Sequence, residues 1–342
     1  MEVVNDYGDA SREHAWLRDG VGVLDLSFRS RLVLAGTDRK RFLHGQVTNN
    51  VSDLHPGEGC YAALVTPKGK MQSDLNIYCL ENELLLDFEP GLTERIAQRF
   101  EKYIVADDVQ VVEVAPHYGL LSVQGPKAHS VLPQISPGID PPDQPMSFTS
   151  TMQPGSGEIY FMNQPRTGTR GFDCYVPIAM LETFAKQMMG AVESVGGHLC
   201  GWQSLEIARI EAGIPRFGAD MDETNLPPET GIEDRAVSYT KGCYIGQEVI
   251  ARIRTYGQVA KALRGLRLAD DLKLLPKRGD KIFRGDKEIG YVTSVLNSPT
   301  LKSNIALGYV RREHNQIGTE LCLRTAQSES MIKIVALPFV KN

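Results

Sequence analysis

The C-terminal quarter of the chain carries the pattern that most restricts the fold. After Ala260, short runs rich in apolar and β-branched residues recur at even intervals and are separated by turn residues. These runs are expected to be strands: 263–268, 279–283, 288–293, 305–310, 317–323 and 331–336. Short, evenly spaced strands of this kind are typical of a small antiparallel barrel or a jelly roll. The sequence therefore predicts a C-terminal antiparallel β-barrel or jelly-roll-like domain over residues 259–342.

The preceding part of the chain mixes helical and strand patterns. Paired strands are expected at 60–65, 73–80 and 83–88, followed by an amphipathic helix near 93–102. Residues 133–145 hold five prolines, which indicates a surface loop or linker before a second group of strands and helices. A chain of 342 residues exceeds what one hydrophobic core usually supports. We therefore expect two or three domains.

Composition and charge exclude several classes of function. A formal charge of -5 and a pI near 5.9 argue against a broad positive surface for nucleic acid. The N-terminal residues lack the basic and apolar parts of a secretion signal, and no later stretch is long and apolar enough to span a bilayer. The six cysteines are scattered without a CxxC pair, which indicates reduced thiols. We expect a cytoplasmic protein with no metal site, no membrane attachment and no direct nucleic-acid binding.

One carboxylate stands out in the middle strand of the first group. Side chains alternate along a strand, so Leu75, Ile77 and Cys79 share an apolar face and Asp74 lies on the opposite face. A carboxylate in that position is usually solvated. It becomes chemically important only if the face lines a pocket.

The segment 241–248, KGCYIGQE, contains a candidate reactive thiol. Cys243 follows Lys241 closely, and the residues after Gly246 favour the first turns of a helix. A nearby ammonium and a helix N-terminus both favour the thiolate over the thiol. The alternative is that Cys243 is a small buried hydrophobe, as free cysteines often are.

Two polar loops are further candidates for ligand binding. Gln46 and Asn49 lie in a loop whose side-chain amides can bind a ligand or can satisfy only the turn backbone. Arg166 and Arg170 can hold an anion bidentately, although surface arginines often have no such role.

A long loop between two helical patterns offers acidic groups. Residues 216–229 are too many for a simple connection, and their glycine and proline residues favour an ordered loop. Because this loop leads towards the cysteine segment, Glu211, Asp220, Glu229 and Cys243 can surround one cavity.

Several blocks together resemble a known family. KGCYIGQE with Arg252 after it resembles the signature of the YgfZ family, which comprises folate-dependent iron–sulfur cluster assembly or repair proteins related to the glycine-cleavage T-protein, an aminomethyltransferase. Further blocks occur in the family order over nearly the whole chain: FLHGQVTN at 42–49, PKGK at 67–70, QGP at 124–126, RTG at 166–168 and RIEAGIP at 209–215. The eight-residue cysteine motif is the most specific of them.

The resemblance implies a fold of the α+β class, in which three domains form a ring around a tetrahydrofolate channel. It implies a first domain from residues 1–50 and 116–200, a second from 51–115 and 201–258, and a barrel at 259–342. T-proteins use a pair of aspartates for methylene transfer. Ser73 and Asp74 occupy that place here, so one carboxylate is missing.

The first functional hypothesis that follows is a tetrahydrofolate-binding accessory factor that assembles or repairs iron–sulfur clusters. Its partners would be cluster carriers or iron–sulfur enzymes, including those of tRNA modification. Cys243 would act as a thiolate that transiently holds sulfur, iron or a mixed disulfide. Lys241 would lower its pKa, and Arg252 would orient a charged partner.

The second hypothesis is a folate-dependent transferase of aminomethyl or methyl groups, which leaves open whether the chain is an enzyme. Asp74 would be the working carboxylate, with Glu211 or Glu229 at the amide edge of the pterin. The predicted folate-binding residues in either case are Asp74, Gln46, Asn49, Arg166, Glu211 and Glu229.

Overall fold

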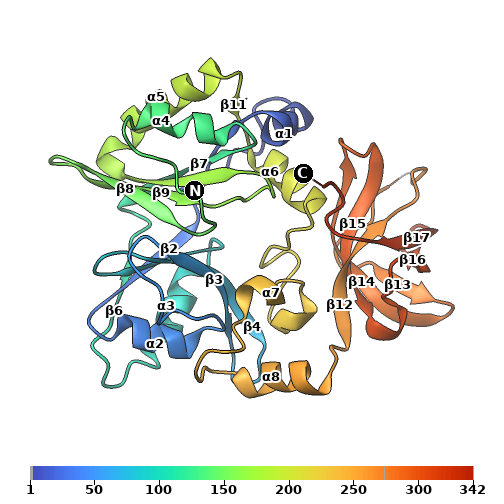
Figure 1. The fold of residues 1–342 in the computed structure, drawn as a ribbon. Helices are drawn as coiled ribbons and strands as arrows, with labels where there is room; N and C mark the ends of the chain where they lie inside the picture. Colours follow the sequence, from blue (N-terminus) through green and yellow to red (C-terminus); the bar gives the residue numbers. More distant parts are fainter. Residues whose placement is uncertain (1–2, 273, 342) are drawn as a thin grey trace. The chain divides into compact units, whose positions relative to one another are not determined.

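The structure is a computed structural model that describes residues 3–272 and 274–341. The chain forms two compact units, whose elements are labelled in Figure 1. Unit 1 comprises the described residues of Met1–Leu64, Ser73–Leu205 and Thr240–Ile245. Unit 2 comprises those of Val65–Gln72, Glu206–Tyr239 and Gly246–Asn342. The chain therefore passes between the units more than once, and residues 241–245 of the cysteine segment belong to unit 1.

The first sheet of unit 1 has six strands in the order β11-β1-β7-β10-β9-β8. These strands are β1 (Gly22–Asp25), β7 (Tyr118–Gln124), β8 (Phe148–Gln153), β9 (Gly157–Asn163), β10 (Gly171–Pro177) and β11 (His198–Leu199). β1 pairs with β11 in parallel, and the other neighbours pair antiparallel. Helix α5 (Leu181–Ser194) and the short helix α4 (Leu132–Ile135) contribute to the apolar cluster of this sheet.

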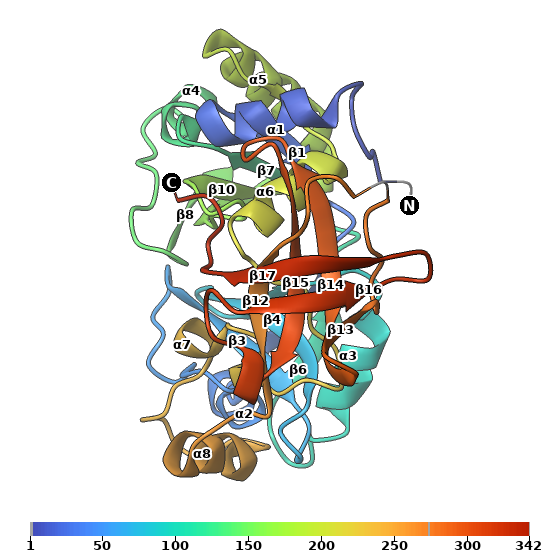
Figure 2. The same cartoon turned by 90° about the vertical axis from the view of Figure 1, so that its right-hand side faces the viewer.

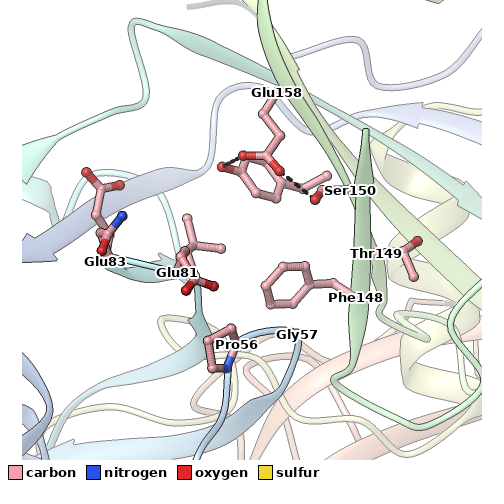
Figure 3. A pocket seen from close by; sticks show the side chains of 11 residues that line it. Pro56, Gly57, Glu81, Glu83, Phe148, Thr149, Ser150 and Glu158 are labelled. Carbon is pink, nitrogen blue, oxygen red and sulfur yellow. Dashed lines mark hydrogen bonds between the residues drawn. The ribbon is translucent and has the colours of Figure 1, made fainter. Parts of the chain in front are cut away.

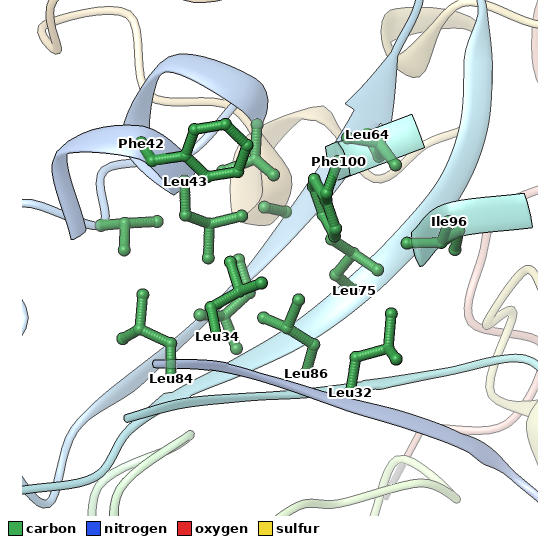
Figure 4. Packing of buried hydrophobic residues seen from close by; sticks show 14 of the residues in the cluster. Leu32, Leu34, Phe42, Leu43, Leu64, Leu75, Leu84, Leu86, Ile96 and Phe100 are labelled. Atoms are coloured by element: carbon green, nitrogen blue, oxygen red, sulfur yellow. The ribbon is translucent and has the colours of Figure 1, made fainter. Parts of the chain in front are cut away.

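The second sheet of unit 1 is inserted in sequence between β1 and β7. It has the order β3-β4-β5-β2-β6. Its strands are β2 (Ser30–Ala35), β3 (Gly59–Val65), β4 (Met71–Cys79), β5 (Leu84–Phe88) and β6 (Gln110–Glu113). Helices α2 (Arg39–Gln46) and α3 (Thr93–Glu101) supply Phe42 and Phe100 to the core on one face (Figure 4). Leu75, Ile77 and Cys79 belong to that core, which confirms the predicted apolar face of the middle strand.

Buried charges join the two sheets of unit 1. Arg29 Nε donates to Asp87 Oδ1 (2.8 Å), and Arg29 Nη1 donates to Glu89 Oε1 (2.5 Å). Arg166 Nη2 donates to Asp87 Oδ2 (3.0 Å) and to Asp173 Oδ2 (2.5 Å). Since Asp87 lies on β5 and Asp173 on β10, the Arg166 guanidinium binds one carboxylate from each sheet.

The electrostatics of this network fix its protonation state. Burial would raise the pKa of Asp87, but the charges of Arg29 and Arg166 outweigh it and hold the pKa of Asp87 well below its usual range. Burial opposes the charge of Arg166, yet Asp173 and Asp87 raise the Arg166 pKa well above its usual value. Asp87 and Arg166 are therefore both charged at neutral pH. A buried charge network of this kind tolerates the loss of a partner poorly.

Unit 2 contains the predicted barrel. A closed barrel has the order β12-β15-β14-β13-β16-β17, and its neighbours pair antiparallel (Figure 2). The strands are β12 (Lys261–Arg267), β13 (Lys281–Arg284), β14 (Lys287–Ser298), β15 (Ser303–Arg311), β16 (Glu320–Arg324) and β17 (Glu329–Val335). Each overlaps one of the strands expected from the sequence. The α+β class and the C-terminal barrel are confirmed, and the alternative of a jelly roll is not.

The long loop of unit 2 is ordered by its contact with the barrel. It follows α6 (Trp202–Glu211), which runs across the boundary of the units, and precedes α7 (Glu233–Ala236) and α8 (Gln247–Tyr256). Asp220 in this loop is buried and accepts from Arg209 Nη1 (2.7 Å), Thr293 Oγ1 (2.6 Å) and Ser294 Oγ (2.7 Å). Asp220 therefore holds the loop onto strand β14.

The domain boundaries inferred from the resemblance remain a prediction. β1 and β2 both fall within the predicted first-domain segment 1–50, but β1 belongs to the six-stranded sheet and β2 to the five-stranded sheet. The change of sheet lies between these two strands. The ring arrangement of three parts also stays a prediction.

Two kinds of feature are missing from the part of the chain that the structure describes. None of its helices combines the length and apolar character needed to cross a membrane. Within the same residues, no three or more His, Cys, Asp or Glu side chains form a group that could hold a metal ion.

The buried network gives a prediction about stability. In Arg166→Met, Asp87 and Asp173 lose a shared cation inside unit 1, and the free energy of unfolding is expected to fall by about 3–5 kcal/mol. Urea unfolding followed by tryptophan fluorescence measures this, because Trp16 and Trp202 both belong to unit 1. Lys186→Met is the control, since it removes only an exposed pair with Glu182 and should leave stability nearly unchanged. An Arg166→Met protein as stable as the control would show that the network contributes little.

Candidate functional site

The cysteine segment is fixed to unit 1 by the lysine that precedes it. Lys241 is buried, and its Nζ donates to the carbonyls of His44 (2.5 Å), Val47 (2.8 Å) and Asn49 (2.8 Å). The backbone N–H of Ile245 donates to the carbonyl of Gly45 (3.0 Å). An ammonium has three donors, so these carbonyls account for all of them. Lys241 therefore acts as an anchor between its own segment and the loop that follows α2.

The surroundings of Lys241 shift several titratable groups. Burial lowers the pKa of Lys241 to about 8, and a weaker interaction with Cys60 opposes this. Burial raises the pKa of Cys60 to about 12 despite the nearby Lys241 charge. Burial and then the Lys241 charge lower the pKa of His44, so this imidazole is neutral at pH 7. The Cys60 thiol is therefore protonated and a poor nucleophile.

Cys243 differs from the other cysteines of the chain in its exposure. All six are free, but Cys79, Cys174 and Cys200 are buried, and Cys60 and Cys322 are partly buried. Cys243 is exposed. The interpretation of Cys243 as a buried hydrophobe is therefore wrong. The sequence predicts that the Lys241 ammonium favours the Cys243 thiolate. The three donors of this ammonium bind backbone carbonyls, so Lys241 does not donate a hydrogen bond to the thiolate.

Within the motif, Gly246 has a backbone conformation that glycine suits best. Its φ is 84°, and a Cβ added there would lie 2.5 Å from the carbonyl oxygen of Thr66. Gly246 is the N-cap of α8 (Gln247–Tyr256), which confirms the expected helix. Arg252 is exposed on this helix in unit 2.

Hydrogen bonds join the loop that follows α2 to strand β3. Thr48 and Ala63 exchange hydrogen bonds, from Thr48 N to Ala63 O (3.0 Å) and from Ala63 N to Thr48 Oγ1 (2.9 Å). Asn49 Nδ2 donates to the carbonyl of Tyr61 (2.8 Å). Gln46 is buried, and its Oε1 accepts from Arg99 Nη1 on α3 (2.8 Å). The described contacts of both predicted amides are thus with the protein itself.

Asp74 is connected to the same loop through one tyrosine. Tyr61 Oη on β3 donates to Asp74 Oδ2 on β4 (2.7 Å), while the Tyr61 carbonyl accepts from Asn49. Asp74 is partly buried. One path of hydrogen bonds therefore runs from Lys241 through Asn49 and Tyr61 to Asp74. The structure brings these predicted residues together in unit 1.

The remaining predicted residue of unit 1 lies in the buried network. Arg166 Nε donates to both oxygens of Asp173 (3.1 and 2.9 Å), and Arg166 Nη2 binds Asp173 and Asp87. These carboxylates bind the Nε and Nη2 donors of Arg166. The structure thus gives Arg166 a structural part, and its binding of an anion stays a prediction.

The two predicted glutamates of unit 2 are both buried but differ in their partners. Glu211 accepts from Ser298 Oγ and Thr300 Oγ1 (2.7 Å), which tie α6 to the barrel. Glu229 Oε2 accepts from the backbone N–H of Leu226 (3.0 Å) within one turn of the loop. Glu229 therefore has an oriented carboxylate with fewer protein partners than Glu211.

Sequence reasoning missed the residues that support the predicted ones. Tyr61 orients Asp74, and Cys60 shares the surroundings of Lys241. The pairing of strands 60–65 and 73–80 could have pointed to Tyr61, because neighbouring strands place such side chains side by side. No local signal pointed to Cys60.

The lysine anchor gives a prediction about pH. The pKa of Lys241 is about 8 in the folded chain and ordinarily 10.5, so between these values the unfolded chain holds more protons at this side chain. Stability contributed through Lys241 therefore rises with pH across this window and is level below it. The difference in unfolding free energy between the natural protein and Lys241→Met, measured from pH 6 to 10.5, should show this rise.

Lys102→Met is the matched control, because it removes an exposed lysine from the same unit. If the difference in unfolding free energy between the natural protein and Lys241→Met fell with pH, the three carbonyls would favour the ammonium more than burial opposes it.

Comparison with known proteins assigns the chain to a family. Residues 1–241 match the GCVT N-terminal domain, and residues 261–341 match the glycine cleavage T-protein C-terminal barrel domain. The aminomethyltransferase of Halalkalibacterium halodurans is 28% identical, in a match over 98% of this chain and 91% of the relative. The aminomethyltransferase of Bacillus subtilis is 27% identical, in a match over 100% of this chain and 93% of the relative. The glycine cleavage system aminomethyltransferase T from Bartonella henselae has a similar fold, with a TM-score of 0.87 at 22% identity, over 98% of this chain and 91% of that one. None of these matches is specific to the YgfZ family. The chain belongs to the glycine cleavage T-protein family.

Proposed function

We propose that this protein is a folate-dependent one-carbon transferase of the T-protein class, which moves an aminomethyl or methyl-derived group to tetrahydrofolate. The observation that carries the proposal is the match to both T-protein domains together with full-length relatives named aminomethyltransferase. This was the second of the two hypotheses from the sequence. The comparisons support it better than the iron–sulfur hypothesis.

Asp74 is the proposed working carboxylate. Positive charge develops on the donor and on the folate nitrogens during transfer, and a fixed carboxylate stabilises that charge. Tyr61 Oη donates to Asp74 Oδ2 at 2.7 Å, which orients the carboxylate before a substrate arrives. Ser73, at the place of the second family aspartate, is fully buried and donates to the backbone carbonyl of Asp74. The chemistry proposed here therefore relies on one carboxylate.

Glu229 is the proposed contact for the pterin. Tetrahydrofolate would supply the nitrogen atoms that accept the one-carbon unit, and its pterin ring presents an N–H and NH2 edge. A carboxylate accepts such an edge through both oxygens. Glu229 is 4% exposed, and one of its oxygens is held by the Leu226 N–H. A buried, oriented carboxylate with this single described hydrogen bond fits the role better than Glu211.

The transferase proposal predicts different effects for the two carboxylates. Purified protein with tetrahydrofolate and an aminomethyl donor should form methylene-tetrahydrofolate, and the amino group of the donor should leave as ammonia. Asp74→Asn is expected to lower kcat about 100-fold and leave the folate Kd nearly unchanged. Glu229→Gln is expected to raise the folate Kd about tenfold or more, because a charged hydrogen bond is lost. No product with any donor, or full activity in Asp74→Asn, would contradict the proposal.

A second candidate is the accessory factor for iron–sulfur clusters, favoured by one observation. Cys243 is the exposed cysteine, and it lies in a segment that Lys241 and Ile245 fix to unit 1. A single thiolate cannot hold a cluster, which normally takes four, so it would hold sulfur, iron or a mixed disulfide only transiently. Arg252, exposed on α8, would contact an anionic partner.

The second candidate gives its own prediction. In cells that lack the natural protein, Cys243→Ala should fail to restore the activity of iron–sulfur enzymes while binding folate normally. Cys322→Ala is the matched control, since it removes a partly buried cysteine of the barrel. Full restoration by Cys243→Ala would remove this thiol from the function. The transferase proposal would be unaffected, because its test depends on Asp74.

A further inference from the structure

A pocket of unit 1 lies outside the groups discussed so far. Its volume is about 420 Å³, which is within the range of small-molecule sites. It is formed by the loop before β3, the turn between β4 and β5, and strands β8 and β9. The lining residues are Pro56, Gly57, Leu80, Glu81, Asn82, Glu83, Phe148, Thr149, Ser150, Glu158 and Tyr160 (Figure 3).

Backbone hydrogen bonds hold the walls of this pocket together. The N–H of Phe148 on β8 donates to the carbonyl of Gly57 (2.8 Å). The N–H of Gly57 donates to the carbonyl of Cys79 at the end of β4 (3.1 Å). The turn is closed by Leu80 N donating to Glu83 O (2.9 Å). The loop, the turn and strand β8 therefore form one connected wall.

The charge of the lining is of one sign. Glu81, Glu83 and Glu158 contribute carboxylates, and none of the eleven lining residues is Lys, Arg or His. Arg39 approaches the turn from outside, but it donates to the backbone carbonyl of Glu81 (3.2 Å). Figure 3 shows Glu158 and the two turn glutamates on different sides of the hollow. Their combined potential favours a cation.

Two aromatic rings complete the pocket. Phe148 and Tyr160 have ring centroids 6.0 Å apart at an angle of 68°, and the Phe148 ring faces the hollow (Figure 3). Tyr160 Oη donates to Glu158 Oε2 (2.7 Å), and Ser150 Oγ donates to Glu158 Oε1 (2.6 Å). These bonds hold the carboxylate beside the rings. A ring face next to a fixed carboxylate is an arrangement that attracts an organic cation.

The spacing of the carboxylates argues against a metal ion as the occupant. Among the described residues, no three or more acidic, His or Cys side chains converge closely enough to hold a metal. A metal ion also prefers oxygen ligands on several sides to an aromatic ring. A larger cation with hydrogen-bond donors spread over several ångströms and an apolar stem fits both the carboxylates and the rings.

We propose that this pocket binds a small organic cation, with its ammonium groups at Glu83 and Glu158 and its hydrocarbon stem against Phe148. The proposal goes beyond the transferase function, and no residue assigned to that function lines the pocket. The site would be a second ligand site of unit 1.

Calorimetric titration of the full-length protein with 1,4-diaminobutane tests the proposal, with sodium chloride at the same ionic strength as the control ligand. Saturable binding of one diamine per chain is expected, and sodium chloride should give no such signal. The double variant Glu81→Gln with Glu83→Gln should raise the diamine Kd roughly tenfold, because one exposed and one partly exposed carboxylate are lost. Phe148→Leu should raise it about threefold.

The double variant Glu94→Gln with Glu101→Gln is the matched control, because it removes the same charge from exposed positions of α3. It should bind the diamine like the natural protein. Equal weakening in both double variants would show a general charge effect and overturn the proposal, as would the absence of saturable binding. Thermal unfolding of each variant shows whether it is folded. Glu158→Gln is an independent second variant, which removes the carboxylate on the opposite wall of the pocket.

Discussion

The Arg166 guanidinium, shared by Asp87 and Asp173, is the contact on which the organisation of unit 1 depends. The two sheets of this unit are separate in their hydrogen bonding, and the second is inserted into the first in sequence. Each sheet covers its outer face with helices and apolar side chains, whereas the charged network lies where the sheets meet. Charges of both signs are matched there, and removing one of them would leave a buried charge without its partner. The catalytic candidate Asp74 lies on a strand of one of these sheets.

The barrel could be predicted from the sequence because its signal is local: six short strands with turns between them are visible strand by strand. The face of β4 that carries Asp74 and Asn76 shows the limit of such reasoning. Alternation correctly separated Leu75 from Asp74, but it indicated a solvated opposite face. Asn76 is in fact buried and donates to Asp87 (2.9 Å), and Tyr78 packs against Tyr175 of the other sheet. Tyr175 belongs to strand β10, more than ninety residues later in sequence, and periodicity within β4 contains no information about this contact.

In the candidate site, too, local sequence indicated candidate residues but not the contacts that they make with distant segments. Sequence reasoning selected Lys241, Asn49 and Asp74 for reasons that had nothing to do with one another, and the structure connects them through Tyr61. It also assigned Lys241 to the neighbouring thiol, whereas the ammonium is used by three carbonyls nearly two hundred positions earlier. The donors of a flexible side chain are decided by which acceptors the fold brings near. Residue type therefore pointed to residues that lie near one another, but it did not indicate which hydrogen bonds they make.

The unequal exposure of the six cysteines has a practical consequence. Burial raises the pKa of Cys60 and Cys200 to about 12, and burial together with Glu329 raises that of Cys322. Thiol reagents react with thiolates, so the raised pKa values slow the reaction of these cysteines at neutral pH. A maleimide dye or spin label should accordingly attach at Cys243 without removal of the other cysteines. The natural chain thus offers an attachment point for spectroscopic probes within the cysteine segment itself.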